Sequence, residues 1–202
     1  MKALAACVFF ACGSAGSQPA PESPPAATPW QVPAGWKHEL IPFPLEFAPA
    51  LGHAGVEELR FAPGFFDPAA PGYWAYAFVW RLDGRPVFDA PTVAAALTTY
   101  FRGLVAAVDE KHEIADRESI RVTAAPAGAQ LALTAHVIDP FTTKQPVDLA
   151  GTAKQLACPA GAVWVFTFAP VGSAMRDQVT ALATLAACGQ PATQNSRSRD
   201  AG

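Results

Sequence analysis

The stretch Tyr73–Leu82 restricts the fold of this chain more than any other part of its sequence. Every second residue in it is large and apolar: Trp74, Tyr76, Phe78, Trp80 and Leu82. Side chains alternate between the two faces of a β-strand, so all of these residues fall on one face. The pair Asp83-Gly84 then ends the strand with a turn. A face this apolar has to be buried, so the chain requires a sheet with a second layer packed on it.

The next segment of the chain is a helix that can supply this second layer. Apolar residues recur along one side of it at spacings of three and four: Val93, Leu97, Tyr100, Phe101, Leu104 and Val108. This pattern predicts an amphipathic helix of about five turns. Asp89 and Pro91 mark its start, and the charged run Asp109-Glu110-Lys111 marks its exit from the core. We expect this helix to pack on the aromatic face of the strand.

The remaining elements indicate an α+β fold. Further strands are predicted at Trp36–Phe43, Val56–Phe61, Ser119–Ala124, Gln130–Ile138, Val147–Leu156 and Val163–Phe168. Ala125-Pro126-Ala127-Gly128 suits a hairpin connection, and short gaps favour antiparallel neighbours. A last helix is predicted at Ala174–Ala187, with Ser173 as its N-cap. The order predicts a largely antiparallel sheet packed with two helices. Its element spacing resembles that of PsbP-like (Mog1-type) domains, which implies an α/β/α sandwich.

Composition indicates one folded domain and argues against nucleic acid as a partner. Of 202 residues, 51% are hydrophobic and 15% are charged, which leaves enough apolar surface to build a core. Residues 34–188 fit the usual size of a single domain. The formal net charge is −3, and the Lys and Arg residues are scattered along the chain rather than clustered. A nucleic-acid-binding domain would need a basic patch.

Residues 1–11 have the organisation of a short export signal. Lys2 supplies the positive start, Leu4–Ala11 the apolar segment, and small residues follow. The junction Ala11-Cys12-Gly13 resembles the lipobox of bacterial lipoproteins, in which the cysteine is diacylated and becomes the mature N-terminus. This resemblance implies that Cys12 is lipidated and anchors the chain in the bacterial cell envelope, on the periplasmic side. Gly13, where Asp would favour the inner membrane, implies the outer membrane.

Two alternatives to this N-terminus stay open. Leu4-Ala5-Ala6-Cys7 matches a lipobox more closely, but almost no apolar segment precedes Cys7, which could be the anchor only with a start codon upstream of Met1. An ordinary signal cleaved near Ala15 would instead give a soluble periplasmic or secreted protein.

The segments that flank the domain are predicted to lack structure, and the remaining cysteines are predicted to pair. Residues 12–33 are rich in Pro, Ala and Ser and read as a tether, and residues 189–202 read as a disordered tail. If Cys7 is removed with the signal and Cys12 is lipidated, Cys158 and Cys188 are left as an even pair in an oxidising compartment. We predict a disulfide between them, with two buried free thiols as the alternative. Neither cysteine belongs to a C-x-x-C motif, which disfavours redox or metal chemistry.

No local motif identifies an enzyme. The sequence contains neither a G-x-S-x-G elbow nor a glycine-rich phosphate loop. His112-Glu113-Ile114-Ala115-Asp116 has Asp where a zinc site of the H-E-x-x-H type needs its second His, so we assign no metal and no cofactor. We assign no catalytic residue: His136 and Asp139 could serve acid–base chemistry, but without a nucleophile nearby in the sequence a partly exposed strand histidine is the favoured interpretation. Glu57 and Glu58 could add a carboxylate, although neighbours on a strand face opposite sides.

A binding site is predicted on the aromatic residues instead. Phe65 and Phe66 lie in a Pro/Gly loop, and exposed aromatic loops often carry recognition. Trp74 begins the aromatic stripe, which could line a groove for a lipid, glycan or peptide, or simply form core beneath the helix. The leading hypothesis is a membrane-tethered, non-enzymatic envelope protein that binds a protein partner or an apolar ligand. The alternatives are a periplasmic hydrolase with a site assembled from dispersed residues, and a structural spacer.

Overall fold

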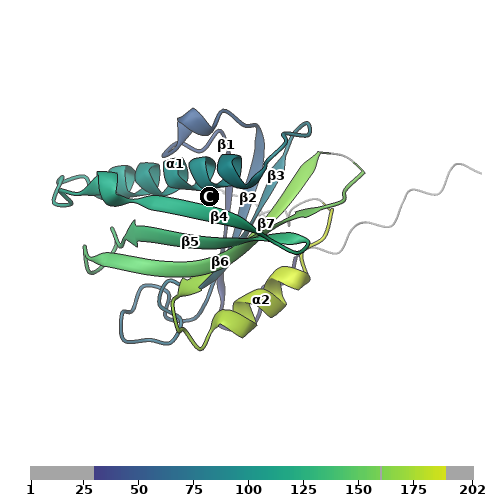
Figure 1. Cartoon of the computed structure of the whole chain (residues 1–202). Coiled ribbons are helices and arrows are strands. Elements are labelled where there is room, and N and C mark those ends of the chain that lie inside the picture. The colour runs from purple at the N-terminus through teal and green to yellow at the C-terminus, as the bar shows by residue number, and fades with distance from the viewer. Residues whose placement is uncertain (1–29, 160, 190–202) are drawn as a thin grey trace, which may run out of the picture.

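A seven-stranded antiparallel sheet packed with two helices forms the fold, in a computed structural model that describes residues 30–159 and 161–189 (Figure 1). The α+β class and the largely antiparallel sheet predicted from the sequence are confirmed. The predicted signal peptide, the two candidate lipidation sites Cys7 and Cys12, most of the predicted tether and nearly all of the predicted tail lie outside the described residues.

The strands form one sheet in the order β1-β2-β3-β7-β6-β5-β4. In chain order, the strands and helices are β1 (Lys37–Phe43), β2 (Gly55–Phe61), β3 (Tyr76–Leu82), α1 (Ala90–Val108), β4 (Arg121–Ala127), β5 (Gln130–Ile138), β6 (Pro146–Leu156), β7 (Ala162–Pro170) and α2 (Arg176–Thr184). Two 3₁₀ turns, Pro49–Leu51 and Arg117–Ser119, lie in the connections. The last strand, β7, returns to the centre beside β3, so α1 connects the centre of the sheet to its far edge at β4.

One face of the sheet packs against α1 and forms the main core. Phe78 of β3 and Phe166 of β7 are cross-strand partners whose ring centroids lie 4.6 Å apart. Tyr100 of α1 stacks on Phe78 at 5.7 Å between centroids. By length and composition alone α1 could cross a membrane. Its buried stripe, which includes Val93 and Leu97, packs into the main core.

The opposite face of the sheet carries α2, which packs on β3 and β7 (Figure 1). Val79 and Val165 from these strands share a smaller core with Val179 and Leu182 of the helix. Strands β3 and β7 are therefore covered on both faces. This double coverage explains why β7 is apolar on both of its faces, as expected for a central strand.

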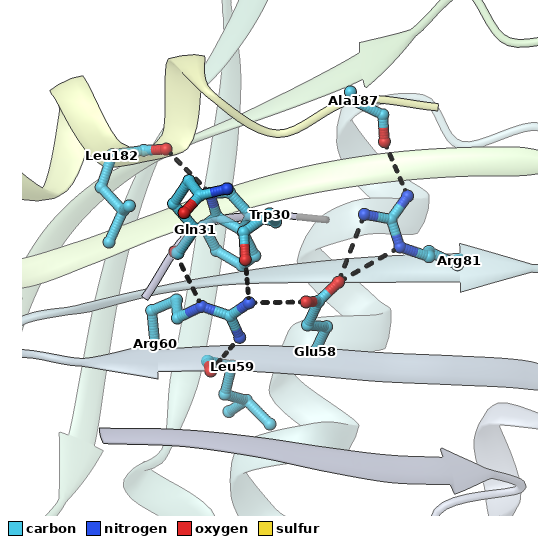
Figure 2. Close-up of polar contacts among 8 residues, drawn as sticks. All are labelled: Trp30, Gln31, Glu58, Leu59, Arg60, Arg81, Leu182 and Ala187. Atoms are coloured by element: carbon cyan, nitrogen blue, oxygen red, sulfur yellow. Dashed lines mark hydrogen bonds and ion pairs between the residues drawn. The ribbon is translucent and has the colours of Figure 1, made fainter. Parts of the chain in front are cut away.

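A buried ionic network lies on the α2 side of the sheet and is centred on Glu58 of β2 (Figure 2). Its Oε1 atom accepts a hydrogen bond of 2.6 Å from Arg60, and its Oε2 atom accepts one of 3.2 Å from the Arg81 Nη2. Glu58 and Arg60 are fully buried, and Arg81 is 8% exposed. Buried charges are tolerated only when they are paired and hydrogen-bonded. Glu58 therefore provides the counter-charge for two guanidinium groups whose burial would otherwise destabilise the fold.

The same network joins the start of the described chain to its end (Figure 2). Arg60 donates to the Trp30 carbonyl oxygen at 2.5 Å, and its guanidinium lies 4.5 Å from the centroid of the Trp30 ring. The Trp30 indole in turn donates to the Leu182 carbonyl oxygen of α2 at 3.0 Å. At the other end, Arg81 donates to the Ala187 carbonyl oxygen at 2.7 Å. The folded domain therefore begins no later than Trp30, before the boundary at residue 34 expected from composition.

The bounds of β3, β4 and α2 differ from those predicted. Strand β3 begins at Tyr76 rather than Tyr73, because Trp74 has a φ of 52° and belongs to the preceding loop. Strand β4 extends to Ala127, so the hairpin turn falls on Gly128, whose φ is 66°. Helix α2 is shorter than predicted at both ends. Ser173 lies before α2, where its hydroxyl accepts a hydrogen bond from the Met175 amide instead of capping the helix.

A disulfide joins Cys158, which follows β6, to Cys188, which follows α2. The predicted pairing is confirmed. The Cα atoms of the two cysteines lie 5.4 Å apart, which is in the usual range for this bond. The disulfide thus ties the segment after α2 to the sheet, close to Ala187 in the ionic network.

Replacing both Cys158 and Cys188 by serine should lower the free energy of unfolding by about 3–4 kcal/mol. The cross-link spans a sequence separation of 30 residues, and its loss gives the unfolded chain more conformational freedom. Urea unfolding of the oxidised wild type and the variant measures the difference, and the reduced wild type should unfold like the variant. Equal stability of the variant and the oxidised protein would contradict the expected role.

Candidate functional site

A cavity of about 210 Å³ lies on the α1 side of the sheet. Its floor consists of β-strand side chains, among them Leu59 and Phe61 of β2 and Tyr76 of β3. Tyr100 and Leu104 of α1 form one wall. Loop residues complete the lining: Phe47, Phe65, Phe66, Trp74 and Phe141. The structure thus places all three aromatic residues predicted for binding, Phe65, Phe66 and Trp74, at a single cavity.

The loop between β2 and β3 brings Phe65, Phe66 and Trp74 together. Its two ends are held by the Trp74 amide, which donates to the Phe65 carbonyl oxygen at 3.2 Å. Gly72 permits this tight loop, because a Cβ atom there would lie 2.0 Å from the Pro63 carbonyl oxygen. Phe65 and Trp74 are buried, whereas Phe66 is 42% exposed. Phe65 and Trp74 therefore form the inner lining, and Phe66 reaches the surface.

A second loop, after β5, places Phe141 beside Phe66. The two rings meet edge to face with centroids 5.2 Å apart, and Phe141 is 37% exposed. The Thr142 hydroxyl donates to the Phe66 carbonyl oxygen at 3.0 Å, which holds the two loops together. Lys37 of β1 places its ammonium group 5.8 Å from the centroid of the Phe66 ring. The rim of the cavity is therefore aromatic and partly exposed.

Asp139, a predicted catalytic candidate, organises this second loop. Its carboxylate accepts hydrogen bonds from the amides of Phe141 at 2.9 Å and Thr143 at 2.8 Å, and from the Tyr73 hydroxyl at 2.8 Å. Burial alone would raise the pKa of Asp139, but these hydrogen bonds outweigh it and hold the pKa below its ordinary value. Asp139 thus remains a charged acceptor that fixes Phe141 at the rim.

His136, the other catalytic candidate, has a different partner. Its Nδ1 atom lies 2.7 Å from Oδ1 of Asp148, its cross-strand neighbour on β6. His136 alternates along β5 with Ala135 and Val137, which belong to the core beneath α1, so its side chain lies on the opposite face. Within the described residues, no hydrogen bond connects His136 with Asp139.

Glu57 is a buried carboxyl group that interacts with Tyr100, one of the residues lining the cavity. It is fully buried, and its Oε1 atom accepts a hydrogen bond of 3.0 Å from the Trp80 indole. Its Oε2 atom has no hydrogen-bond partner among the described residues. Burial raises the pKa of Glu57 to about 8, while the Trp80 indole and the Tyr100 hydroxyl act in the opposite direction. Glu57 and Glu58 lie on opposite faces of the sheet, as predicted, and therefore belong to separate sites.

Charge at the cavity itself comes from Glu39 of β1. Glu39 is exposed, lines the cavity and is the one charged residue among its lining side chains. Sequence reasoning missed Glu39, Tyr100, Leu104 and Phe141, because their convergence depends on contacts between distant segments. In residues 30–159 and 161–189, no group of three or more His, Cys, Asp and Glu side chains is arranged to hold a metal ion.

Comparison with known proteins adds no relative: no family model, no curated protein and no solved structure matches this chain. The resemblance to PsbP-like domains therefore stays a prediction.

Proposed function

We propose that this chain is a lipid-anchored protein of the bacterial cell envelope whose folded domain binds an apolar ligand. The observation that carries the binding proposal is the aromatic cavity with its partly exposed rim. Soluble proteins generally bury such aromatic surface completely, and exposed apolar concavities tend to mark binding sites. At this cavity the two loops joined by the Thr142–Phe66 hydrogen bond supply a rim whose phenylalanine rings remain partly exposed.

The size of the cavity limits the ligand. At about 210 Å³ it exceeds an engineered cavity of about 150 Å³ that takes up benzene. It is smaller than the roughly 300–1,000 Å³ typical of sites for drug-sized molecules. The ligand, or the part of it that enters, therefore has the bulk of one ring, a branched head group or a short acyl segment.

Binding is favoured over catalysis by the partners of the candidate residues. Asp139 is engaged in holding its own loop, and His136 pairs with Asp148 on the other face of the sheet. A hydrolase would need a nucleophile and a base within hydrogen-bonding reach of each other. Because Glu39 is the one charged group in an otherwise aromatic and aliphatic lining, the described residues form no such pair there, and a ligand would be held without being transformed.

The binding proposal is tested by titrating the purified protein with toluene in a calorimeter. Toluene should bind, and Leu104→Trp should weaken binding by about tenfold or more, because the larger side chain fills the space at the α1 wall. Ala107→Trp is the matched control, since Ala107 lies on the exposed side of the same helix and should leave binding unchanged. Circular dichroism verifies that both variants are folded. Unchanged toluene binding by Leu104→Trp would place the ligand elsewhere.

The anchoring proposal is tested by intact-mass analysis of the chain purified from bacterial membranes. We expect a mature chain that begins at Cys12, carries diacylglycerol and lacks two hydrogens because of the Cys158–Cys188 bond. A Cys12→Ser variant should be recovered without the lipid mass. An unmodified wild-type chain that starts near Gly16 would overturn the lipid anchor and leave the binding proposal intact.

A further inference from the structure

The cavity combines an aromatic lining with acidic charge. Aromatic side chains line it from β2, β3, α1 and the surrounding loops, and Glu39 is the one charged lining residue. No Lys, Arg or His side chain lines the cavity within the described part of the chain. Ring faces carry negative quadrupole potential and attract cations, most strongly where water is excluded. An anionic ligand such as a fatty-acid carboxylate would find a positive partner only at the rim, in Lys37, and would meet Glu39 in the lining itself.

One side chain of the protein already makes a cation–π contact at the rim of the cavity. The Lys37 ammonium lies 5.8 Å from the centroid of the Phe66 ring, which is within the range of a cation–π contact. Lys37 and Glu39 lie two positions apart on β1, so both side chains are on the same face of that strand. Lys37 is exposed and has a long, unbranched side chain, so its ammonium group can leave the ring when another cation arrives.

From this combination we infer that the ligand is an organic ammonium compound with methyl or other alkyl groups on its nitrogen, such as a quaternary ammonium head group. The inference rests on the proposed function, because it names the ligand class of the same cavity. The alkyl groups contact the rings of Phe61, Trp74 and Tyr100, and Glu39 balances the positive charge. A trimethylammonium head group has about the bulk of a benzene ring, which fits the cavity of about 210 Å³.

The test compares choline with 3,3-dimethylbutan-1-ol, which has the same shape but carries carbon in place of the charged nitrogen. Calorimetric titration of the full chain should give a dissociation constant about tenfold or more lower for choline, as expected for a partly desolvated cation–π site. Glu39→Gln should remove part of this preference, and Glu46→Gln should not, because Glu46 is exposed and does not line the cavity.

Each outcome of this comparison decides between the two proposals. If the neutral alcohol binds as tightly as choline or more tightly, the cation preference is wrong and the apolar binding site stands. If neither compound nor toluene binds, the proposed function and the ligand class both fail. If choline is preferred but Glu39→Gln and Trp74→Leu leave its affinity unchanged, choline binds at another place and the inference is overturned.

Discussion

Glu57→Gln should abolish most of the decrease in stability that the wild-type protein undergoes between about pH 5 and pH 8. Burial raises the pKa of Glu57 from its ordinary value of 4.5 to about 8 in the folded protein. Between these values the folded chain holds a proton that the unfolded chain releases. Stability therefore falls as pH rises through this window, and the loss is complete above the folded-state pKa.

The expected size of this effect follows from the pKa difference. The shift from 4.5 to about 8 corresponds to a loss on the order of 5 kcal/mol at high pH. Glutamine resembles the protonated carboxyl in shape but does not ionise, so the variant should match the wild type near pH 5 and exceed it clearly at pH 9. Urea unfolding at both pH values measures the difference, with exposed Glu46→Gln as the control. Parallel pH profiles for wild type and Glu57→Gln would show that Glu57 does not ionise in the way described.

Glu58→Gln should lower the free energy of unfolding by about 3–5 kcal/mol, because it leaves the buried guanidinium groups of Arg60 and Arg81 without a counter-charge. Burial already lowers the pKa of Arg60, and the nearby Glu58 carboxylate opposes this shift. Arg60 and Arg81 bind the Trp30 and Ala187 carbonyl oxygens, so the segments at both ends of the domain should also exchange their amide hydrogens faster.

The matched control for Glu58→Gln is Glu118→Gln. Glu118 pairs with Arg102 at 3.0 Å, but its side chain is 85% exposed, and such surface pairs contribute at most about 1 kcal/mol. Urea unfolding of the two variants therefore separates a buried charge pair from an exposed one. Equal, small losses for both variants would mean that the Glu58 network contributes little to the stability of the fold.

Local periodicity was sufficient to predict the main elements of this fold. The alternation around Phe78 and Trp80 and the helical spacing from Val93 to Val108 both mark surfaces that must be buried, and each forms part of the main core. Sequence patterns could not predict that Trp74 leaves the strand, because its positive φ is imposed by the closure of the loop on Phe65. Nor could they predict the burial of Trp30, which depends on Arg60 and on α2, far away in the sequence.

The candidate site was predictable only in part, for the same reason. A pair of phenylalanines in a Pro/Gly loop and the start of the aromatic stripe identified Phe65, Phe66 and Trp74. Phe141 could not be identified, because its ring reaches Phe66 through a separate loop that Asp139 organises. The carboxylate of Asp139 looked suited to acid–base chemistry in the sequence. The hydrogen bonds that this carboxylate accepts from backbone amides position the loop at the rim of the cavity.

The central claim is that the aromatic cavity takes up an apolar molecule, and nuclear Overhauser effects between protein and ligand test it most directly. With toluene added to the isotope-labelled protein, we predict effects from the toluene protons to the rings of Phe61, Trp74 and Tyr100. Leu104→Trp should remove them, and Ala107→Trp should retain them. Saturating toluene that gives no effect to these rings, or effects only to residues outside the cavity, would contradict the claim.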